Sequence, residues 1–319
     1  MSYKILSKKY VVINNTKREL TTSETNTLLR SIELINSKNN CPMVYRCNNL
    51  TNLYSVLNEY SIEDISNKIF MLGEKAKNFY NDHDCLDNLC GKQRNYLLNM
   101  NDTSDETFKF IYNNIKDDNH HNDTDFKIFF QETSESKFLQ IIQPIQNNDK
   151  LMIRDYYYAY LHTMDNVVKT YSHYVSTTLK YEEALKFGKD ENKIIYHYIL
   201  TESYYKFAIH SKNISENISE LCKKYNLPAY KARYDSEDEI SIKGGLLPHF
   251  IFGIEHIMAN EEPEFIVNPH LFEKNFKIDD IITKGLLINQ ESFEDIIKTT
   301  KYNKYFSIFQ QDDINEFNV

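Results

Sequence analysis

Two carboxylates spaced two residues apart, Glu262 and Glu264, form the pattern in this sequence that is best suited to chemistry. Pro263 between them lacks an N–H and favours extended backbone at Glu262, so the pattern predicts an edge strand that continues through Val267. Side chains two apart on a strand project from the same face, where two carboxylates repel each other. A cationic centre in a substrate would offset this repulsion, and we therefore expect the pair to bind one.

A serine and a threonine stand at the same two-residue spacing earlier in the chain. Residues 173–178 alternate between two faces, which predicts a strand that carries Ser176 and Thr178. The strand runs directly into residues 181–187, an expected helix that Gly188 ends and for which Thr178 is the expected N-cap. The sequence therefore predicts a strand that turns into a helix within a few residues.

Two arginines follow short apolar segments and are candidates for the cationic part of a site. The run 151–153 predicts a buried strand with Arg154 at its end, and the run 42–45 predicts a strand that leads into Arg46. A guanidinium offers a planar fork of donors that suits a phosphate group. Arg154 lies 22 residues before Ser176 (176 − 154), whereas Arg46 lies 130 residues before it (176 − 46).

The elements that must position these residues divide the chain into two predicted parts. Residues 1–145 are expected to be mainly helical, because apolar side chains between residues 50 and 114 recur at helical spacing. Residues 146–319 contain short apolar runs typical of strands and few helices, with a polar insertion at 211–243. We therefore expect an α+β fold with a helical N-terminal region, followed by the part that carries the chemistry.

Composition and charge narrow the class of protein. The chain of 319 residues is 41% hydrophobic and 26% charged, which is typical of a folded globular protein. Its net charge of -9, without a long run of Lys or Arg, argues against nucleic acid as a partner. Five cysteines without CxxC spacing argue against a zinc site. No stretch approaches the roughly 20 apolar residues of a membrane-spanning helix, so we expect no membrane partner.

The order of these motifs along the chain resembles a known family. Arginine, then Ser-x-Thr, then Glu-x-Glu is similar to the mono-ADP-ribosyltransferases of the arginine–serine–glutamate type. More narrowly, it resembles the dinitrogenase reductase ADP-ribosyltransferases and related bacterial effectors. The resemblance rests on Ser176-Thr177-Thr178, on Glu183-Ala184 and Phe187-Gly188 in the helix that follows, and on Leu246-Leu247-Pro248 followed by 262–267.

The resemblance implies an enzyme that transfers ADP-ribose from NAD to a protein side chain, with arginine as the expected acceptor. The transition state would resemble an oxocarbenium ion. In the family's pattern, Glu264 stabilises this transition state and Glu262 assists the arginine acceptor. Ser176 positions Glu264 and the ribose of NAD, while Thr178 supports the turn between strand and helix.

The resemblance also bears on the remaining site residues. Compact members of the family have the shorter spacing between arginine and serine, which favours Arg154 over Arg46 as the residue that clamps an NAD phosphate. An aromatic side chain that stacks on nicotinamide is implied as well, and Phe207 is the candidate. Residues 146–319 would then form an ADP-ribosyltransferase-type β-sheet core that binds NAD as a substrate and needs no metal.

Two other functions remain open for the same residues. One is an NAD glycohydrolase, which would use the same site with water as the acceptor. The other is a protein-binding module without catalysis, built on the helices of residues 50–145. Nicotinamide release with and without protein targets would separate the two enzymes, and binding of labelled NAD would test the third possibility.

The expected partner of the transferase is a protein, such as a metabolic enzyme modified on arginine. Residues 1–145 would act as a scaffold or recognise this target, with Glu59, Glu63 and Glu74 as the first acidic side chains to test on an exposed face. Residues 1–10 contain three lysines and no long apolar core, which does not fit a secretory signal. We expect a location in the cytoplasm, or secretion into a host cell without a cleavable signal.

Overall fold

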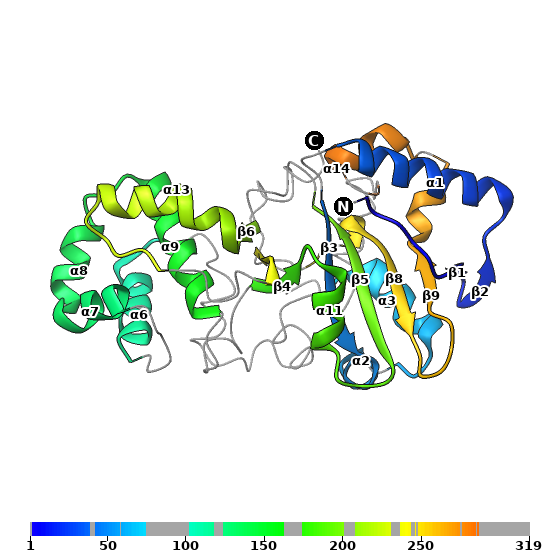
Figure 1. Ribbon diagram of the computed structural model, residues 1–319, viewed down its shortest axis with the longest axis horizontal. Coiled ribbons are helices and arrows are strands. Elements are labelled where there is room, and N and C mark those ends of the chain that lie inside the picture. Colours follow the sequence, from blue (N-terminus) through cyan, green and yellow to red (C-terminus); the bar gives the residue numbers. More distant parts are fainter. Residues whose placement is uncertain are drawn as a thin grey trace.

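The computed structural model contains two lobes that lie side by side along the long axis of the molecule (Figure 1). One lobe consists of helices, and the other is a β-sheet with helices packed against it. The structure describes residues 2–38, 42–57, 59–74, 102–117, 124–162, 174–200, 208–230, 237–243, 246, 248–274, 276–284 and 286. Within these ranges, no helix has both the length and the apolar character needed to cross a membrane.

The described strands form one sheet in the order β2-β1-β9-β8-β5-β3-β4-β7-β6. Neighbouring strands run antiparallel, except β1 and β9, which run parallel. The strands are β1 (Lys8–Ile13), β2 (Thr16–Glu19), β3 (Met43–Asn49), β4 (Tyr174–Thr178), β5 (Lys193–Ile199), β6 (Ala208–His210), β7 (Glu239–Lys243), β8 (Ile251–Ile257) and β9 (Glu264–Val267). The first fifty residues and the second half of the chain therefore share one sheet.

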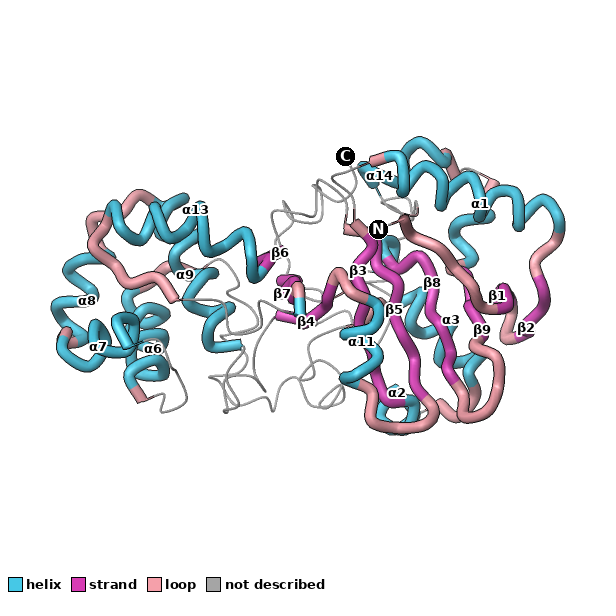
Figure 2. The backbone as a smooth tube through the Cα atoms, viewed as in Figure 1, coloured by secondary structure: helices cyan, strands magenta, loops and turns pink. Residues whose placement is uncertain are grey.

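The sheet changes direction between β3 and β4. These two strands meet at one register pair, Tyr45 opposite Thr178, whereas β3 pairs with β5 along its whole length. Figure 2 shows β4 and β7 turned across the direction of β3 and β5. The sheet therefore opens at the junction of β3 with β4, which is the strand that carries Ser176.

Helices cover both faces of the sheet. They are α1 (Thr22–Ser37), α2 (Leu50–Leu57), α3 (Ile62–Leu72), α11 (Tyr181–Phe187), α14 (Ile281–Lys284) and the 3-10 turns η3 (Pro248–Phe250), η4 (Pro269–Phe272) and η5 (Ile278–Asp280). Phe265 and Val267 of β9 pack with residues of α1 and α14, while Ile266 between them packs with residues of α2 and α3. Successive side chains of β9 thus enter different cores, as expected for a strand buried on both faces.

The helical lobe has an aromatic core. Its helices are α6 (Asp105–Lys116), α7 (Thr124–Glu132), α8 (Glu135–Ile142), α9 (Asn147–His162) and α13 (Ser211–Lys224). The ring centroids of Phe126 and Tyr160 lie 4.8 Å apart, and the ring of Tyr156 stacks on that of Tyr230 at 4.3 Å. The hydroxyl of Tyr156 donates to the backbone oxygen of Tyr230 at 3.0 Å, so this buried phenol has its hydrogen-bond partner.

Polar side chains mark where several of the helices begin. At α1, Thr21 accepts a hydrogen bond from the backbone N–H of Glu24, and the Glu24 carboxylate accepts one from the N–H of Thr21. Ser61, Ser104 and Ser134 accept from backbone N–H groups in the first turns of α3, α6 and α8. These caps satisfy donors that a helix leaves unpaired at its start.

The two lobes do not follow the predicted boundary at residue 145. The sheet lobe contains β1 to β3 and α1 to α3, so the predicted helical region 1–145 is divided between the lobes. The predicted sheet core 146–319 is divided as well, because α9 and α13 belong to the helical lobe. The predicted insertion 211–243 contains helix α13 and strand β7 of the sheet. The mixed α+β class is confirmed, but the order of a helical region followed by a sheet core is not.

The predicted strand and helix around Ser176 are both present, unlike the predicted domain order. Residues 174–178 form β4 and residues 181–187 form α11, as the alternation and the following Gly188 predict. Thr178 is not the N-cap of α11, since Lys180 occupies that position without a side-chain cap. The Thr178 hydroxyl instead accepts a hydrogen bond from the Lys180 N–H at 3.0 Å. This short loop of hydrogen bonding turns the chain from the strand into the helix.

Candidate functional site

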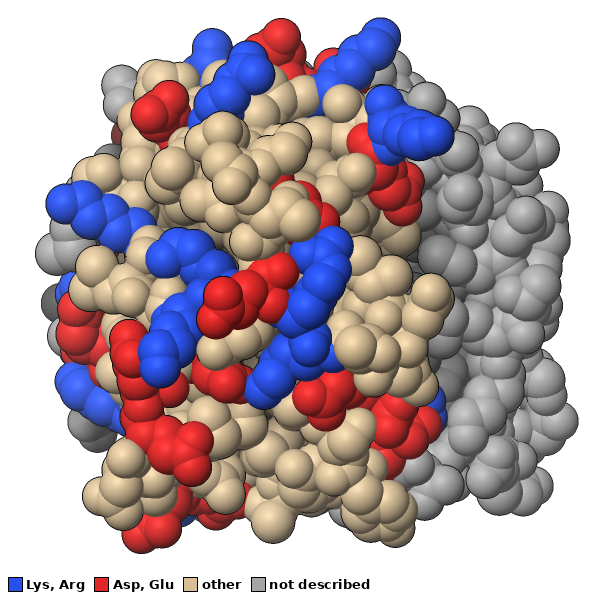
Figure 3. All heavy atoms as spheres, turned by 90° about the vertical axis from the view of Figure 1, so that its right-hand side faces the viewer, with Lys and Arg blue, Asp and Glu red and all other residues tan. Residues whose placement is uncertain are grey.

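Lysines neutralise the predicted carboxylate pair, Glu262 and Glu264. The Lys8 Nζ lies 3.1 Å from an oxygen of Glu262, and the Lys17 Nζ lies 2.6 Å from an oxygen of Glu264. Figure 3 shows positive and negative side chains interleaved on the side of the molecule where β1, β2 and α1 lie. The protein itself supplies the cations that offset the repulsion between these carboxylates. Their spacing is therefore explained without a cationic substrate.

Arg154 lies in the core of the helical lobe and not at the end of a strand. It belongs to α9, is 1% exposed, and has its guanidinium 4.6 Å from the centre of the Tyr158 ring. Its Nη1 donates to the carboxylate of the adjacent Asp155. The strand predicted at 151–153 is wrong: these residues belong to helix α9 (Asn147–His162), which is buried at every residue from Tyr156 to His162. A short apolar run of this kind does not by itself distinguish a strand from a buried helix.

Arg46, the other candidate arginine, lies beside the predicted serine. It is on β3, next to β4 in the sheet, and its Nη1 donates to the backbone oxygen of Ser176 at 2.9 Å. The Arg46 side chain is 28% exposed. The structure thus brings together Ser176 and the arginine that lies 130 residues before it, and leaves Arg154 in the other lobe.

Glu74 holds the guanidinium of Arg46 in place. The Nε of Arg46 donates to one oxygen of Glu74 at 2.6 Å, and Asn48 donates to the other at 2.6 Å. Burial by itself lowers the pKa of Arg46, but attraction to Glu74 outweighs it, so the pKa of Arg46 lies above its usual value. Glu74 is 4% exposed, which corrects its expected place on an exposed face.

The backbone around Glu74 explains how a carboxylate comes to be buried at this point. Gly73 ends α3 with a φ of 71°, a left-handed conformation that favours glycine. A Cβ on Gly73 would meet the backbone oxygen of Leu246 at 2.0 Å. Glu74 then forms an antiparallel bridge with Leu246, and its N–H donates to the Leu246 oxygen at 2.8 Å. The close approach at Gly73 therefore fixes the backbone from which Glu74 reaches Arg46.

A second pair of glutamates with the same spacing, Glu237 and Glu239, lies beside the serine strand. Glu239 opens β7, next to β4, and stands opposite Thr178 in the register. Ser241 stands opposite Ser176, and its hydroxyl donates to Oε1 of Glu239 at 3.3 Å. The Thr178 hydroxyl donates to the backbone oxygen of Glu237 at 2.5 Å. These contacts join the start of β7 to the end of β4.

The sequence contains a signal for β7 that the prediction of a polar insertion at 211–243 missed. Residues 239–243 alternate polar and apolar side chains, and Ile240 and Ile242 are buried at 1% and 0% exposure. Asp238, between the two glutamates, has a φ of 48° and pairs with the Nζ of Lys180 at 2.8 Å. A turn into a half-buried strand therefore underlies this charged segment.

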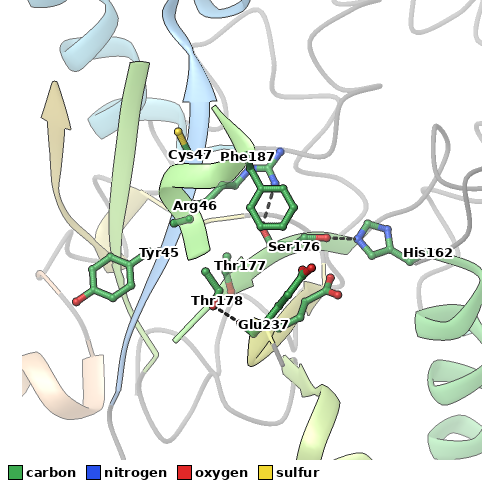
Figure 4. A pocket seen from close by; sticks show the side chains of 11 residues that line it. Tyr45, Arg46, Cys47, His162, Ser176, Thr177, Thr178, Phe187 and Glu237 are labelled. Atoms are coloured by element: carbon green, nitrogen blue, oxygen red, sulfur yellow. Dashed lines mark hydrogen bonds between the residues drawn. The ribbon is translucent and has the colours of Figure 1, made fainter. Parts of the chain in front are cut away.

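A cavity of about 320 Å³ lies where these elements meet (Figure 4). This volume is at the lower end of the range typical of small-molecule sites. The described residues that line it are Tyr45, Arg46 and Cys47 of β3, Ser176, Thr177 and Thr178 of β4, Ala184 and Phe187 of α11, Glu237 and Glu239 at the start of β7, and His162 of α9. Of the predicted site residues, Ser176 and Thr178 line the cavity, whereas Arg154, Glu262 and Glu264 do not.

Cys47 lines this cavity but does not supply a thiolate. Burial raises the pKa of the Cys47 thiol to about 11, so the thiol stays protonated at neutral pH. Gly188 follows α11, and a Cβ there would lie 2.5 Å from the Cys47 Sγ. Glycine at this position therefore allows the end of the helix to approach β3 closely. Nucleophilic chemistry by Cys47 is not what this environment favours.

Phe187 provides an aromatic ring at the cavity. It is the last residue of α11 and is 59% exposed. Figure 4 shows its ring projecting over the cavity that Arg46 and Ser176 also line. Phe207, the aromatic residue expected from the sequence, lies outside the described residues. The Phe187-Gly188 step, cited above only for the family resemblance, is a signal from which the ring of Phe187 could have been found.

The cavity is lined by a positively charged side chain from β3 and by negatively charged side chains at the start of β7. Arg46 offers guanidinium donors that suit a phosphate, while Glu237 and Glu239 offer carboxylates. Such an arrangement fits a ligand that carries negative phosphates and a second centre on which positive charge develops. Among the described residues, no group of three or more His, Cys, Asp or Glu is arranged to hold a metal ion.

Comparisons of the whole chain with protein-family models, with curated proteins and with solved structures found no match.

Proposed function

We propose that this protein is an NAD-dependent mono-ADP-ribosyltransferase that modifies a protein side chain, with Arg46, Ser176 and Glu239 in its site. The observation that carries the proposal is the meeting of three motifs in one cavity: an arginine on β3, Ser-Thr-Thr on β4 and Glu-x-Glu at the start of β7. They follow one another in the chain in the order of the family that the sequence resembles. The order is kept when the roles first expected for Arg154 and Glu264 are assigned to Arg46 and Glu239 instead.

The properties of the cavity suit NAD as the substrate. Arg46 would bind a phosphate of NAD through guanidinium donors not used by Glu74 or Ser176. The exposed ring of Phe187 would stack on the flat nicotinamide or adenine ring. The ion pair with Glu74 holds the guanidinium before NAD arrives, so less conformational entropy is lost on binding.

The reaction breaks the bond between C1′ of the ribose and the nicotinamide nitrogen. Nicotinamide leaves with the bonding electron pair, and positive charge develops on C1′ and the ring oxygen. The Glu239 carboxylate stabilises this charge, and the hydroxyl of Ser241 holds one of its oxygens. Ser176, opposite Ser241 in the register, orients the ribose and the carboxylate from the neighbouring strand.

The second carboxylate, Glu237, serves the acceptor. A guanidinium is a poor nucleophile because its pKa exceeds about 12. As the acceptor nitrogen forms its bond to C1′, Glu237 takes the proton that this nitrogen releases. The same site with water as acceptor would hydrolyse NAD. The presence of two carboxylates in the cavity favours the transferase and an arginine acceptor.

The proposal is tested by incubating the purified protein with biotin-labelled NAD, first with a small guanidine compound and then with a cell lysate. We expect nicotinamide release together with labelling of the guanidine and of protein. The control is the double variant Arg46→Ala, Ser176→Ala, which should show neither. Release of nicotinamide without any labelled acceptor would make the protein a glycohydrolase. A wild-type protein that neither binds nor cleaves NAD would overturn the proposal.

A further inference from the structure

The helical lobe reaches the candidate site through a histidine. Of the described residues that line the cavity, His162 comes from the helical lobe and the others come from the sheet lobe or its helices. His162 is the last residue of α9 and is 6% exposed. Its Nε2 lies 2.8 Å from the hydroxyl oxygen of Ser176, as the dashed line in Figure 4 marks.

Ser176 is therefore held from two directions. Its backbone oxygen accepts a hydrogen bond from Arg46 at 2.9 Å, and its hydroxyl contacts His162 at 2.8 Å. The first contact comes from within the sheet, and the second comes from an element of the other lobe. Since the contact is made to the side chain, His162 acts on the group that the proposed reaction uses.

We infer that His162 is a positioning residue for the transfer reaction and that it acts through Ser176. The inference rests on the proposed function. His162 donates its Nε2–H to the serine oxygen, which leaves the hydrogen of the Ser176 hydroxyl to donate toward Glu239 or the ribose. If His162 instead carried its hydrogen on Nδ1, its Nε2 would accept a hydrogen bond from the Ser176 hydroxyl. The serine could then no longer donate to Glu239 or to the ribose.

This role makes the helical lobe part of the catalytic apparatus. The end of α9 sets the direction of a hydroxyl in the sheet lobe, so a displacement of the helical lobe relative to the sheet would change turnover. A packing role for the imidazole is the alternative, because its ring lies 5.9 Å from the ring of Tyr174. An experiment must therefore separate the hydrogen bond at Nε2 from the packing of the ring.

Two variants of His162 make this separation. The side-chain amide nitrogen of Gln reaches the place of Nε2, whereas that of Asn reaches the place of Nδ1. Both variants lose the same aromatic ring, so their melting temperatures should fall together. We expect His162→Gln to keep kcat within about threefold of the wild type and His162→Asn to lose roughly tenfold, the size of one hydrogen bond. The KM for NAD should stay within about twofold in both, since the contact serves the transition state.

Pairing with Ser176→Ala tests whether the effect passes through the serine. If it does, His162→Asn should lower kcat in the wild type but cause no further loss in the Ser176→Ala background. Equal kcat values for the Gln and Asn variants, or a full additional loss in the Ser176→Ala background, would overturn the inference while the wild type stays active. A wild type that neither binds nor cleaves NAD would overturn the proposed function, and this inference with it.

Discussion

Two pairs of glutamates with identical spacing open strands in this molecule, and their neighbours differ. Glu262 and Glu264 stand at the start of β9, where lysines of β1 and β2 lie 3.1 Å and 2.6 Å from their carboxylates. Glu237 and Glu239 stand at the start of β7, beside β4 and within the cavity that Arg46 lines. The first pair belongs to a face of interleaved charges, and the second lines the cavity.

The comparison shows that the spacing of two carboxylates does not by itself determine their chemistry. Repulsion within such a pair must be offset in every case. At Glu264, the Nζ of Lys17 lies 2.6 Å away and forms an ion pair, so a side chain of the protein itself compensates the charge of this carboxylate. At the start of β7, by contrast, Glu239 lines the cavity and accepts a hydrogen bond from the Ser241 hydroxyl at 3.3 Å, and in the proposed reaction the substrate brings a positive charge to it.

The largest effect should come from removing the carboxylate proposed to stabilise the transition state. We expect Glu239→Gln to lower the rate of nicotinamide release on the order of a thousandfold, because the amide has no negative charge. Glu264→Gln is the matched control and should leave the rate near that of the wild type. The rates are measured by nicotinamide release, with melting temperatures as a check of folding. If Glu264→Gln shows the larger loss, the two pairs must exchange roles.

The upstream members of the two pairs should differ in a second way. Glu237→Gln is expected to reduce labelling of a guanidine acceptor about a hundredfold while NAD hydrolysis continues, because its task is proton transfer from the acceptor. Glu262→Gln should change neither activity. Labelling and nicotinamide release are measured in the same reaction. Parallel loss of both activities in Glu237→Gln would mean that this residue has no separate role toward the acceptor.

The cationic residues near the two glutamate pairs, Arg46 and Lys17, should differ in their effect on NAD binding, and this effect is smaller than those on the rates. Arg46→Lys keeps a positive charge opposite Glu74 but removes the guanidinium fork, and we expect roughly thirtyfold weaker NAD binding, or about 2 kcal/mol. Lys17→Gln removes the cation next to Glu264 and should leave the affinity for NAD unchanged. Isothermal titration compares the two. Weaker binding by the Lys17 variant alone would place the phosphate site on the β9 side.

The smallest expected effect is on the stability of the protein at low pH. It concerns the ion pair between Arg18 of β2 and Glu24 of α1, on the same side of the molecule as β9. Arg18 is the main cause that lowers the pKa of Glu24 from 4.5 to about 2, and the Arg18 Nη2 lies 2.7 Å from Glu24 Oε1. A depressed carboxyl pKa contributes stability above pH 4.5, which is lost as the pH falls through about 2. We expect Glu24→Gln to cost roughly 0.5 kcal/mol at pH 7 and less toward pH 2. Urea unfolding across this range measures it, and an unchanged pH dependence would contradict it.

The sequence alone determined the local structure around the serine. Alternation over residues 173–178, followed by a helix that Gly188 ends, predicts β4 and α11, and both are present. The strand from Glu264 to Val267 is also present, but it pairs with β1 on one side and β8 on the other, so the predicted edge position is wrong. Each of these features depends on side-chain periodicity and on a turn or glycine within a few residues. Interactions between residues so close in the chain can be predicted from the sequence alone.

Tertiary structure alone decided which arginine and which glutamates join the serine. Arg46 and Ser176 are 130 residues apart and meet because β3 and β4 become neighbours in the sheet. Arg154 is much closer in sequence, but α9 buries it among aromatic rings of the other lobe. Both glutamate pairs carry the same local signal, and the strands beside them distinguish the two. Strand pairing depends on the burial of many distant side chains together, so the spacing of a motif cannot reveal it.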